Sequence, residues 1–164
     1  MRELDPLTFL VAESLMGAKG AETEAVVRRA LTDAGASEGH DDRLCLVLLA
    51  HGSKDPRWRE PFERIARELE GELGKGHVRL AYMEFTGPTL MDVAAECASQ
   101  SLLNLRVLPL FMAVGAHLIH DIPQQIEAVR GKYPELAVRV LAPIGEDGRL
   151  VRLIEQIAVE AAQA

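Results

Sequence analysis

Short apolar runs alternate with longer amphipathic stretches from residue 44 to the end of the chain. Residues 44–50, LCLVLLA, are continuously apolar, as expected for a central parallel strand that is covered on both faces. Three more segments have the length and composition of strands: residues 77–85, 105–112 and 136–142. Pro109 makes the middle of the third strand less regular, because proline cannot donate a hydrogen bond to a neighbouring strand.

A helical periodicity follows each of these strands. The amphipathic stretches cover residues 57–74, 88–100, 121–132 and 148–162, and Asp121 stands where an N-cap is expected. Strand and helix thus alternate four times, which indicates a parallel sheet with right-handed crossovers and helices on its faces. The expected fold class is α/β, with a central, mainly parallel four-stranded sheet.

Residues 1–42 follow a different pattern. Residues 7–16 and 22–34 have the spacing of two helices, and a polar stretch follows them. No chemical motif is visible in this part of the chain. We therefore expect a helical leader and linker over residues 1–42, followed by an α/β domain over residues 43–164.

The composition fits folded protein and limits the partners. Of the 164 residues 48% are hydrophobic, and the formal net charge of −7 argues against a general nucleic-acid binder, which needs excess Lys and Arg. No apolar stretch suits a membrane span or a secretory signal, so we expect a cytoplasmic protein. Cys45 and Cys97 stand in apolar segments outside any CxxC pair, which indicates buried free thiols.

Chemically versatile side chains follow three of the predicted strands. His51 comes directly after the first strand, Glu84 stands at the end of the second, and His117 follows the third. Because ligands bind beyond the carboxyl ends of parallel strands, we expect the two histidines to share one metal site. Two imidazoles, with a carboxylate as helper, suit a divalent transition metal and leave coordination positions open. His120 lies three residues after His117 and more simply makes a loop contact.

Other interpretations of the same residues remain open. A single histidine at a strand end most often packs or caps a loop, and Glu84 could be a solvated carboxylate. Lys54, Arg57 and Arg59 form a basic cluster that is either an exposed helix start or a receptor for carboxylates. Ser53 could belong to a phosphate cradle or to a Ser-His-Asp hydrolase, but neither a P-loop nor a GxSxG elbow is present, and a turn cap is simpler.

Three segments resemble the small sirohydrochlorin chelatases, which are ATP-independent class II tetrapyrrole chelatases. They are residues 50–57 (AHGSKDPR), 82–84 (YME) and 109–123, which contains GAH and DIP. The resemblance covers roughly residues 43–164, and its specific element is the HGS motif paired with a downstream GxHxxxDIP. Ala50, where the family often has Gly, and Lys54, where it often has Arg, depart from the pattern, as does the long leader.

The resemblance implies a three-layer chelatase-like fold and the insertion of Co²⁺ or Fe²⁺ into sirohydrochlorin, for cobalamin or siroheme synthesis. It implies that His51 and His117 bind the metal and accept protons, with Glu84 as a helper. Ser53, Lys54, Arg57 and Arg59 are candidates for binding the macrocycle. The metal is then a substrate and no cofactor is permanently bound, and small members of the family form homodimers. A metallochaperone that uses the same histidines, and a flavodoxin-like cofactor binder, are the alternatives.

Overall fold

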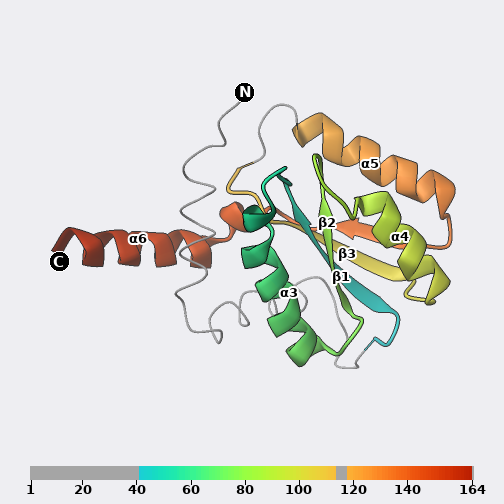
Figure 1. Ribbon diagram of the computed structural model, residues 1–164, viewed down its shortest axis with the longest axis horizontal. Helices are drawn as coiled ribbons and strands as arrows, with labels where there is room; N and C mark the ends of the chain where they lie inside the picture. Colours follow the sequence, from blue (N-terminus) through green and yellow to red (C-terminus); the bar gives the residue numbers. More distant parts are fainter. Residues whose placement is uncertain (1–40, 114–117, 164) are drawn as a thin grey trace.

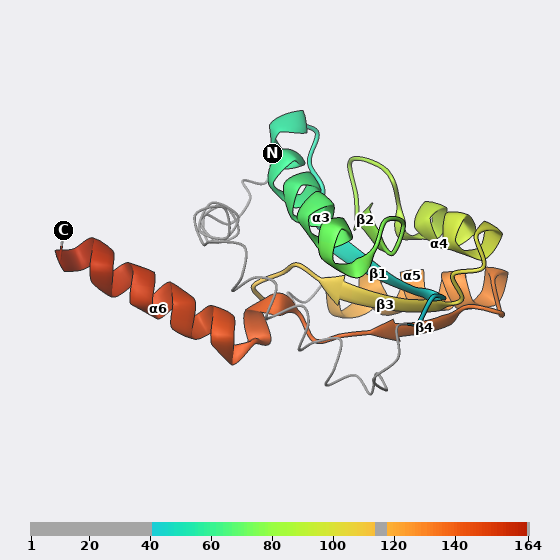
Figure 2. The ribbon, with the colours of Figure 1, turned by 90° about the horizontal axis from the view of Figure 1, so that it is seen from below.

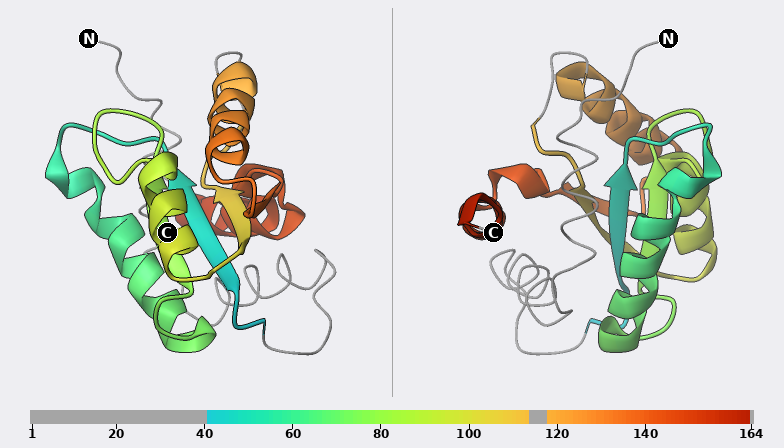
Figure 3. Two further views of the ribbon diagram at one scale, coloured as in Figure 1. Left: turned by 90° about the vertical axis from the view of Figure 1, so that its right-hand side faces the viewer. Right: turned by 60° about the vertical axis from the view of Figure 1, so that its left-hand side comes forward.

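The computed structural model describes residues 41–113 and 118–163, and a four-stranded parallel sheet lies at its centre (Figure 1). The strands are β1 (Leu44–Ala50), β2 (Val78–Tyr82), β3 (Asn104–Pro109) and β4 (Ala137–Val140), in the order β2-β1-β3-β4. The arrowheads of β1 and β3 point the same way (Figure 3, left). All four carboxyl ends therefore lie at one edge of the sheet.

Helices cover both faces of the sheet and make a three-layer α/β fold. Helix α3 (Glu60–Leu73) lies on one face, and α4 (Leu90–Ser99) and α5 (Leu118–Lys132) lie on the other (Figure 1). Short 3-10 turns at η1 (Pro56–Trp58) and η2 (Ile144–Glu146) precede α3 and α6. Helix α6 (Gly148–Gln163) projects away from the sheet (Figure 2). No helix in the described ranges has the length and apolar character that crossing a bilayer requires.

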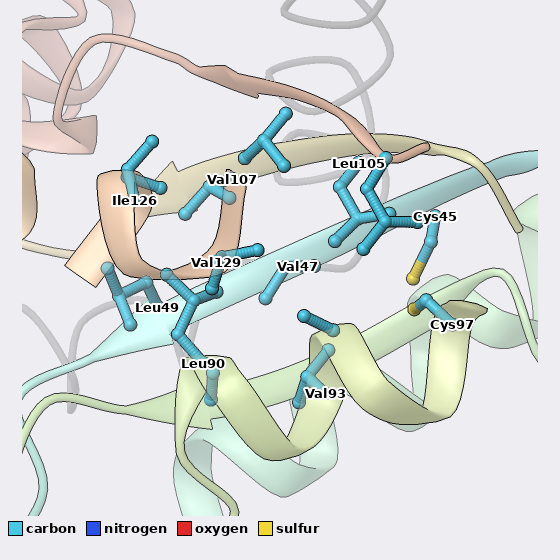
Figure 4. Close-up of a cluster of buried hydrophobic side chains, with 14 of the residues drawn as sticks. Cys45, Val47, Leu49, Leu90, Val93, Cys97, Leu105, Val107, Ile126 and Val129 are labelled. Carbon is cyan, nitrogen blue, oxygen red and sulfur yellow. The ribbon is translucent and has the colours of Figure 1, made fainter. Parts of the chain in front are cut away.

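The larger core cluster lies between the sheet and the pair α4 and α5. Alternate β1 residues Cys45, Val47 and Leu49 point to this side and pack against Val93 of α4 and Val129 of α5 (Figure 4). The Cys45 and Cys97 sulfur atoms face each other inside this cluster, and both thiols are free and buried, as predicted (Figure 4).

The opposite face of β1 packs under α3. Leu46 and Leu48 contact Ile65 and Leu69 of that helix in a second, smaller cluster. Residues 45–50 are thus buried on both faces, which explains why the central strand is a continuous apolar run.

Several predicted boundaries were wrong by a few residues. Residues 57–59 form the η1 turn and its end, so the first helix begins at Glu60. The strand predicted over 77–85 ends at Tyr82, and the strand predicted over 105–112 ends at Pro109, where its missing N–H matters least.

The predicted N-cap at Asp121 was also wrong. Helix α5 begins at Leu118, so Asp121 lies in its first turn, where a carboxylate still interacts well with the helix dipole. Apart from Asp41 and Asp42, the predicted leader over residues 1–42, with helices over 7–16 and 22–34, lies outside the described residues.

Candidate functional site

His51 and Glu84 lie side by side at the carboxyl edge of the sheet. His51 directly follows β1, and Glu84 comes two residues after β2. Strand pairing continues past both ends, because the Glu84 N–H donates to the His51 carbonyl oxygen at 3.1 Å. The side chains meet there, with 3.3 Å between His51 Nδ1 and Glu84 Oε1. The structure thus brings together two of the residues that the sequence selected.

The contact with Glu84 has a chemical consequence for the imidazole. Histidines that bind metals commonly direct one ring N–H to a carboxylate, which leaves the lone pair of the other nitrogen for the metal. A proton on His51 Nδ1 would face Glu84 in this way and assign Nε2 as the donor atom. The Phe111 ring packs edge-on against His51, with 6.2 Å between ring centroids and 86° between the planes. Both contacts restrict the orientation of the imidazole.

Gly52 allows the loop after β1 to approach the segment after β2. Its φ is +97°, and a Cβ atom built on it would lie 2.0 Å from the Glu84 carbonyl oxygen. Any other residue would therefore both strain the backbone and separate the two segments. The glycine of the HGS motif is a positional requirement for the contact between His51 and Glu84.

A pocket opens beside His51, between the loop after β1, the end of β2 and the start of α3. It is lined by His51, Gly52, Ser53, Trp58, Arg59, Phe62, Tyr82 and Leu110. Its free volume of about 10 Å³ accepts roughly one water-sized group at a time, so larger ligands would insert only one end.

The three side chains of the predicted basic cluster make different contacts. Arg57 is exposed and makes a two-pronged contact with Asp55, with 3.0 Å from Nε to Oδ1 and 2.6 Å from Nη2 to Oδ2. These hydrogen bonds hold the pKa of the Asp55 carboxyl below its usual range. Lys54 Nζ lies 5.8 Å from the Phe85 ring centroid, where a cation–π contact is expected. Of the three cations, Arg59 lines the pocket.

Ser53 and Asp55 organise the turn that leads into α3. The Ser53 Oγ accepts a hydrogen bond from the Asp55 N–H at 3.1 Å, and Asp55 in turn accepts from the Arg57 N–H and caps η1. Ser53 therefore makes the turn contact expected of a cap, and it also lines the pocket.

His117 lies outside the described residues, so its predicted partnership with His51 stays a prediction. His120 lies on α5 and is exposed. Within residues 41–113 and 118–163 no three His, Cys, Asp or Glu side chains form a group that could hold a metal ion. The pair of His51 and Glu84 could supply two donors at most, and further ligands would have to come from elsewhere.

Sequence reasoning missed two features of this edge. Tyr82, the last residue of β2, lines the pocket, and its position at the carboxyl end of a strand could have selected it. Phe85 is 58% exposed although it is large and apolar, and its φ of 65° is unusual for a non-glycine residue. Its ring adds an apolar surface beside Glu84.

Comparison with protein families and known proteins points to one kind of activity. The CbiX family model matches residues 45–161. The sirohydrochlorin cobaltochelatase of Sulfurisphaera tokodaii is 29% identical over 111 residues, which cover 68% of this chain and 88% of that protein. The sirohydrochlorin ferrochelatase of Bacillus subtilis is also 29% identical, but the matched part covers only 43% of its length.

Solved structures of a CbiX protein and of a chelatase are similar to this chain as well. A cobalamin biosynthesis CbiX protein from Marinobacter aquaeolei VT8 aligns with a TM-score of 0.64 and 34% identity, over 72% of this chain and 96% of that one. The sirohydrochlorin chelatase SirB from Bacillus subtilis subspecies spizizenii, in complex with cobalt, aligns with a TM-score of 0.63. At 21% identity the second likeness shows the fold alone; it covers 71% of this chain and 50% of SirB.

Proposed function

This chain belongs to the CbiX family, and from that premise we propose that it is a sirohydrochlorin chelatase, which inserts Co²⁺ or Fe²⁺ into a tetrapyrrole. The observation that carries the proposal is the contact of 3.3 Å between His51 Nδ1 and Glu84 Oε1, at the carboxyl edge of a sheet with the chelatase topology. The metal is a substrate, and the product leaves with it.

The proposed reaction exchanges two pyrrole protons for one metal ion. The macrocycle lies over the strand ends, with its carboxylate arms near Ser53, Lys54 and Arg59 and an edge against the exposed Phe85 ring. Arg57, engaged with Asp55, guides the arms at longer range. His51 and His117 bind the incoming metal on one side of the ring. An imidazole or the Glu84 carboxylate takes each proton as a general base.

Glu84 acts chiefly through His51 in this proposal. The carboxylate faces Nδ1, so that Nε2 presents its lone pair to the metal. An open set of two histidines suits a metal that must be passed on, whereas a closed four-ligand site would retain it. We propose, in addition, that residues 43–164 form the chelatase-like domain and that residues 1–42 are a leader and linker. We also propose a cytoplasmic location, with which the two free buried thiols agree, because thiols stay reduced there.

We also propose that the protein acts as a homodimer. The matched part covers 50% of SirB and 43% of the Bacillus subtilis ferrochelatase, so two copies of this chain would supply about the length of one such protein. The projecting helix α6 supports this, because Val151 and Val159 are exposed along it and Leu150 is the buried residue of its described part.

The test is anaerobic metal insertion followed by absorbance. Purified protein, sirohydrochlorin and Co²⁺ or Fe²⁺ should give the metallated product faster than the reaction without protein. His51→Ala should lower the accelerated rate by about 100-fold or more, because it removes a ligand and a proton acceptor together. Glu84→Gln should have a smaller effect of about tenfold, as expected for an orienting group.

The matched control is His77→Gln, at the opposite edge of the sheet. His77 Nδ1 contacts the Leu44 carbonyl oxygen at 2.7 Å, and this variant should retain the wild-type rate. A wild-type protein that binds Co²⁺ without accelerating insertion would instead be a metallochaperone. Retention of full activity by both His51→Ala and His117→Ala would contradict the assigned site.

A further inference from the structure

Tyr82 buries a hydroxyl group that has no hydrogen-bond partner among the described residues. The side chain is 3% exposed and belongs to the last residue of β2, two positions before Glu84. Buried polar atoms in folded proteins almost always have a partner, and an orphaned one lowers stability. A buried hydroxyl at the edge where ligands bind therefore calls for an acceptor.

The surroundings of this hydroxyl indicate what kind of acceptor it would meet. Tyr82 lines the same pocket as Arg59 and His51, and the apolar side chains of Trp58, Phe62 and Leu110 form the rest of the wall. Arg59 is held near the pocket by its contact with Glu63, at 4.0 Å from Nε to Oε1. The available volume accepts about one water-sized group, such as one oxygen atom of a carboxylate arm.

The protonation state of Tyr82 favours the same conclusion. Burial, with a smaller contribution from Glu63, raises the pKa of the hydroxyl to about 12. Tyr82 therefore stays an O–H donor at neutral pH and cannot accept a pyrrole proton. An O–H donor that shares a pocket with a guanidinium suits an anionic acceptor, and hydrogen bonds to charged groups are stronger than neutral ones.

We propose that the Tyr82 hydroxyl and the Arg59 guanidinium bind one carboxylate arm of the tetrapyrrole, and that Tyr82 thereby positions the ring over His51. Tyr82 is a positioning residue here, because it touches an arm of the substrate and not its reacting nitrogen atoms. The inference rests on the proposed function, since it takes the ligand to be a polycarboxylate macrocycle.

The experiment removes one oxygen atom by Tyr82→Phe and measures binding separately from catalysis. Fluorescence titration with metal-free sirohydrochlorin should give a Kd about tenfold or more above wild type. At saturating macrocycle, kcat should stay within about twofold of wild type, while KM rises in parallel with Kd. The Tm of the ligand-free variant should be equal to or above that of wild type, because an orphaned buried hydroxyl has been removed.

The matched control is Tyr133→Phe, which makes the same chemical change outside the pocket. Tyr133 is half-buried against the α4 and α5 side of the core, and its loss of a hydroxyl should leave Kd for the macrocycle unchanged. Arg59→Gln tests the second half of the receptor. If both groups bind the same carboxylate, the loss of binding free energy in the double variant should be smaller than the sum of the losses in the two single variants.

Five outcomes decide the inference. A raised Kd with unchanged or higher Tm, and coupling to Arg59, supports it. An unchanged Kd in Tyr82→Phe overturns it, and so does a lowered Tm with normal binding, which would mean a structural hydroxyl. A lowered kcat at unchanged Kd also overturns it. If wild type binds sirohydrochlorin and Tyr82→Phe weakens binding, yet no metal is inserted, the carboxylate receptor stands and the chelatase proposal fails.

Discussion

Single residues determine whether the candidate site can form at all. The clearest case is Gly52, whose missing Cβ lets the carbonyl oxygen of Glu84 come close to the loop after β1. The backbone contact between His51 and Glu84 depends on this approach, and the contact between their side chains follows from it.

Gly52→Ala should therefore disrupt both stability and the site. The added methyl group would clash with the Glu84 backbone, and φ of +97° disfavours alanine, so the free energy of unfolding should fall by about 1–3 kcal/mol. Denaturant unfolding and the insertion assay measure the two effects. The control is Gly71→Ala within α3, where nothing lies within 4 Å of the new Cβ. This variant should raise the free energy of unfolding by about 0.5–1 kcal/mol. A Gly52→Ala variant as stable as wild type would contradict the close approach.

Helix ends show how the local sequence determines where a helix begins. Thr89 and Asp92 form a complete capping box at the start of α4, with Thr89 Oγ1 accepting from the Asp92 N–H at 3.2 Å. Asp147 has a similar place before α6, because its Oδ1 accepts from the Arg149 N–H at 2.8 Å. These caps satisfy N–H groups that the helix itself leaves without partners.

The Asp147 cap should give α6 a pH-dependent contribution to stability. Hydrogen bonds from Arg149 lower the pKa of Asp147 from 3.8 to about 2. Because the folded-state pKa is depressed, the contribution is complete above pH 3.8 and is lost as the pH falls through about 2. Asp147→Asn should lower stability at pH 7 by about 0.5 kcal/mol, since the cap is partly exposed, and match wild type near pH 2.

Thermal unfolding between pH 2 and pH 7 measures this difference. Glu155→Gln, an exposed carboxylate on the same helix, should show no comparable dependence. A difference between Asp147→Asn and wild type that persists unchanged at pH 2 would exclude the ionised cap as its cause.

At the scale of the whole molecule, α6 is the element that the rest of the described chain leaves mostly uncovered. It projects from the sheet (Figure 2). Its apolar positions Leu150, Leu153, Ile154 and Ile157 recur at helical spacing; Leu150 is buried, and the other three are half-buried. A lone helix with such a stripe gains stability only when the stripe is covered. A second copy of the chain is the occupant that we propose, because the matched part covers about half of SirB and of the Bacillus subtilis ferrochelatase.

Ile157→Glu should therefore convert the proposed dimer into a monomer. A charge in the apolar stripe would be desolvated at the interface, and light scattering after gel filtration should give half the mass found for wild type. Gln156→Glu introduces the same charge at an exposed position of α6 and should remain dimeric. A wild-type protein that is already monomeric at micromolar concentration would contradict the proposed homodimer.

The strands, and the chemically active residues that follow them, could be predicted because the patterns that indicate them are local in the sequence. Residues 44–50 are apolar throughout because a central parallel strand is buried on both faces, and this pattern is visible without coordinates. The rule that parallel strands end at one edge then selected His51 and Glu84 together, and their contact confirms that placement. The predicted ends of the elements were less accurate: α5 begins at Leu118, three residues before the predicted N-cap at Asp121.

The sequence alone determined the α/β class and the parallel sheet, because hydrophobic periodicity records which faces are buried. It also carried the family motif, because that motif is a pattern of residue types and spacing. Tertiary structure decided which neighbours each side chain meets. It placed Arg59 and Tyr82 with His51 around one pocket, and it buried the Tyr82 hydroxyl. These outcomes depend on distances between segments that are far apart in the chain, and no local pattern encodes such distances.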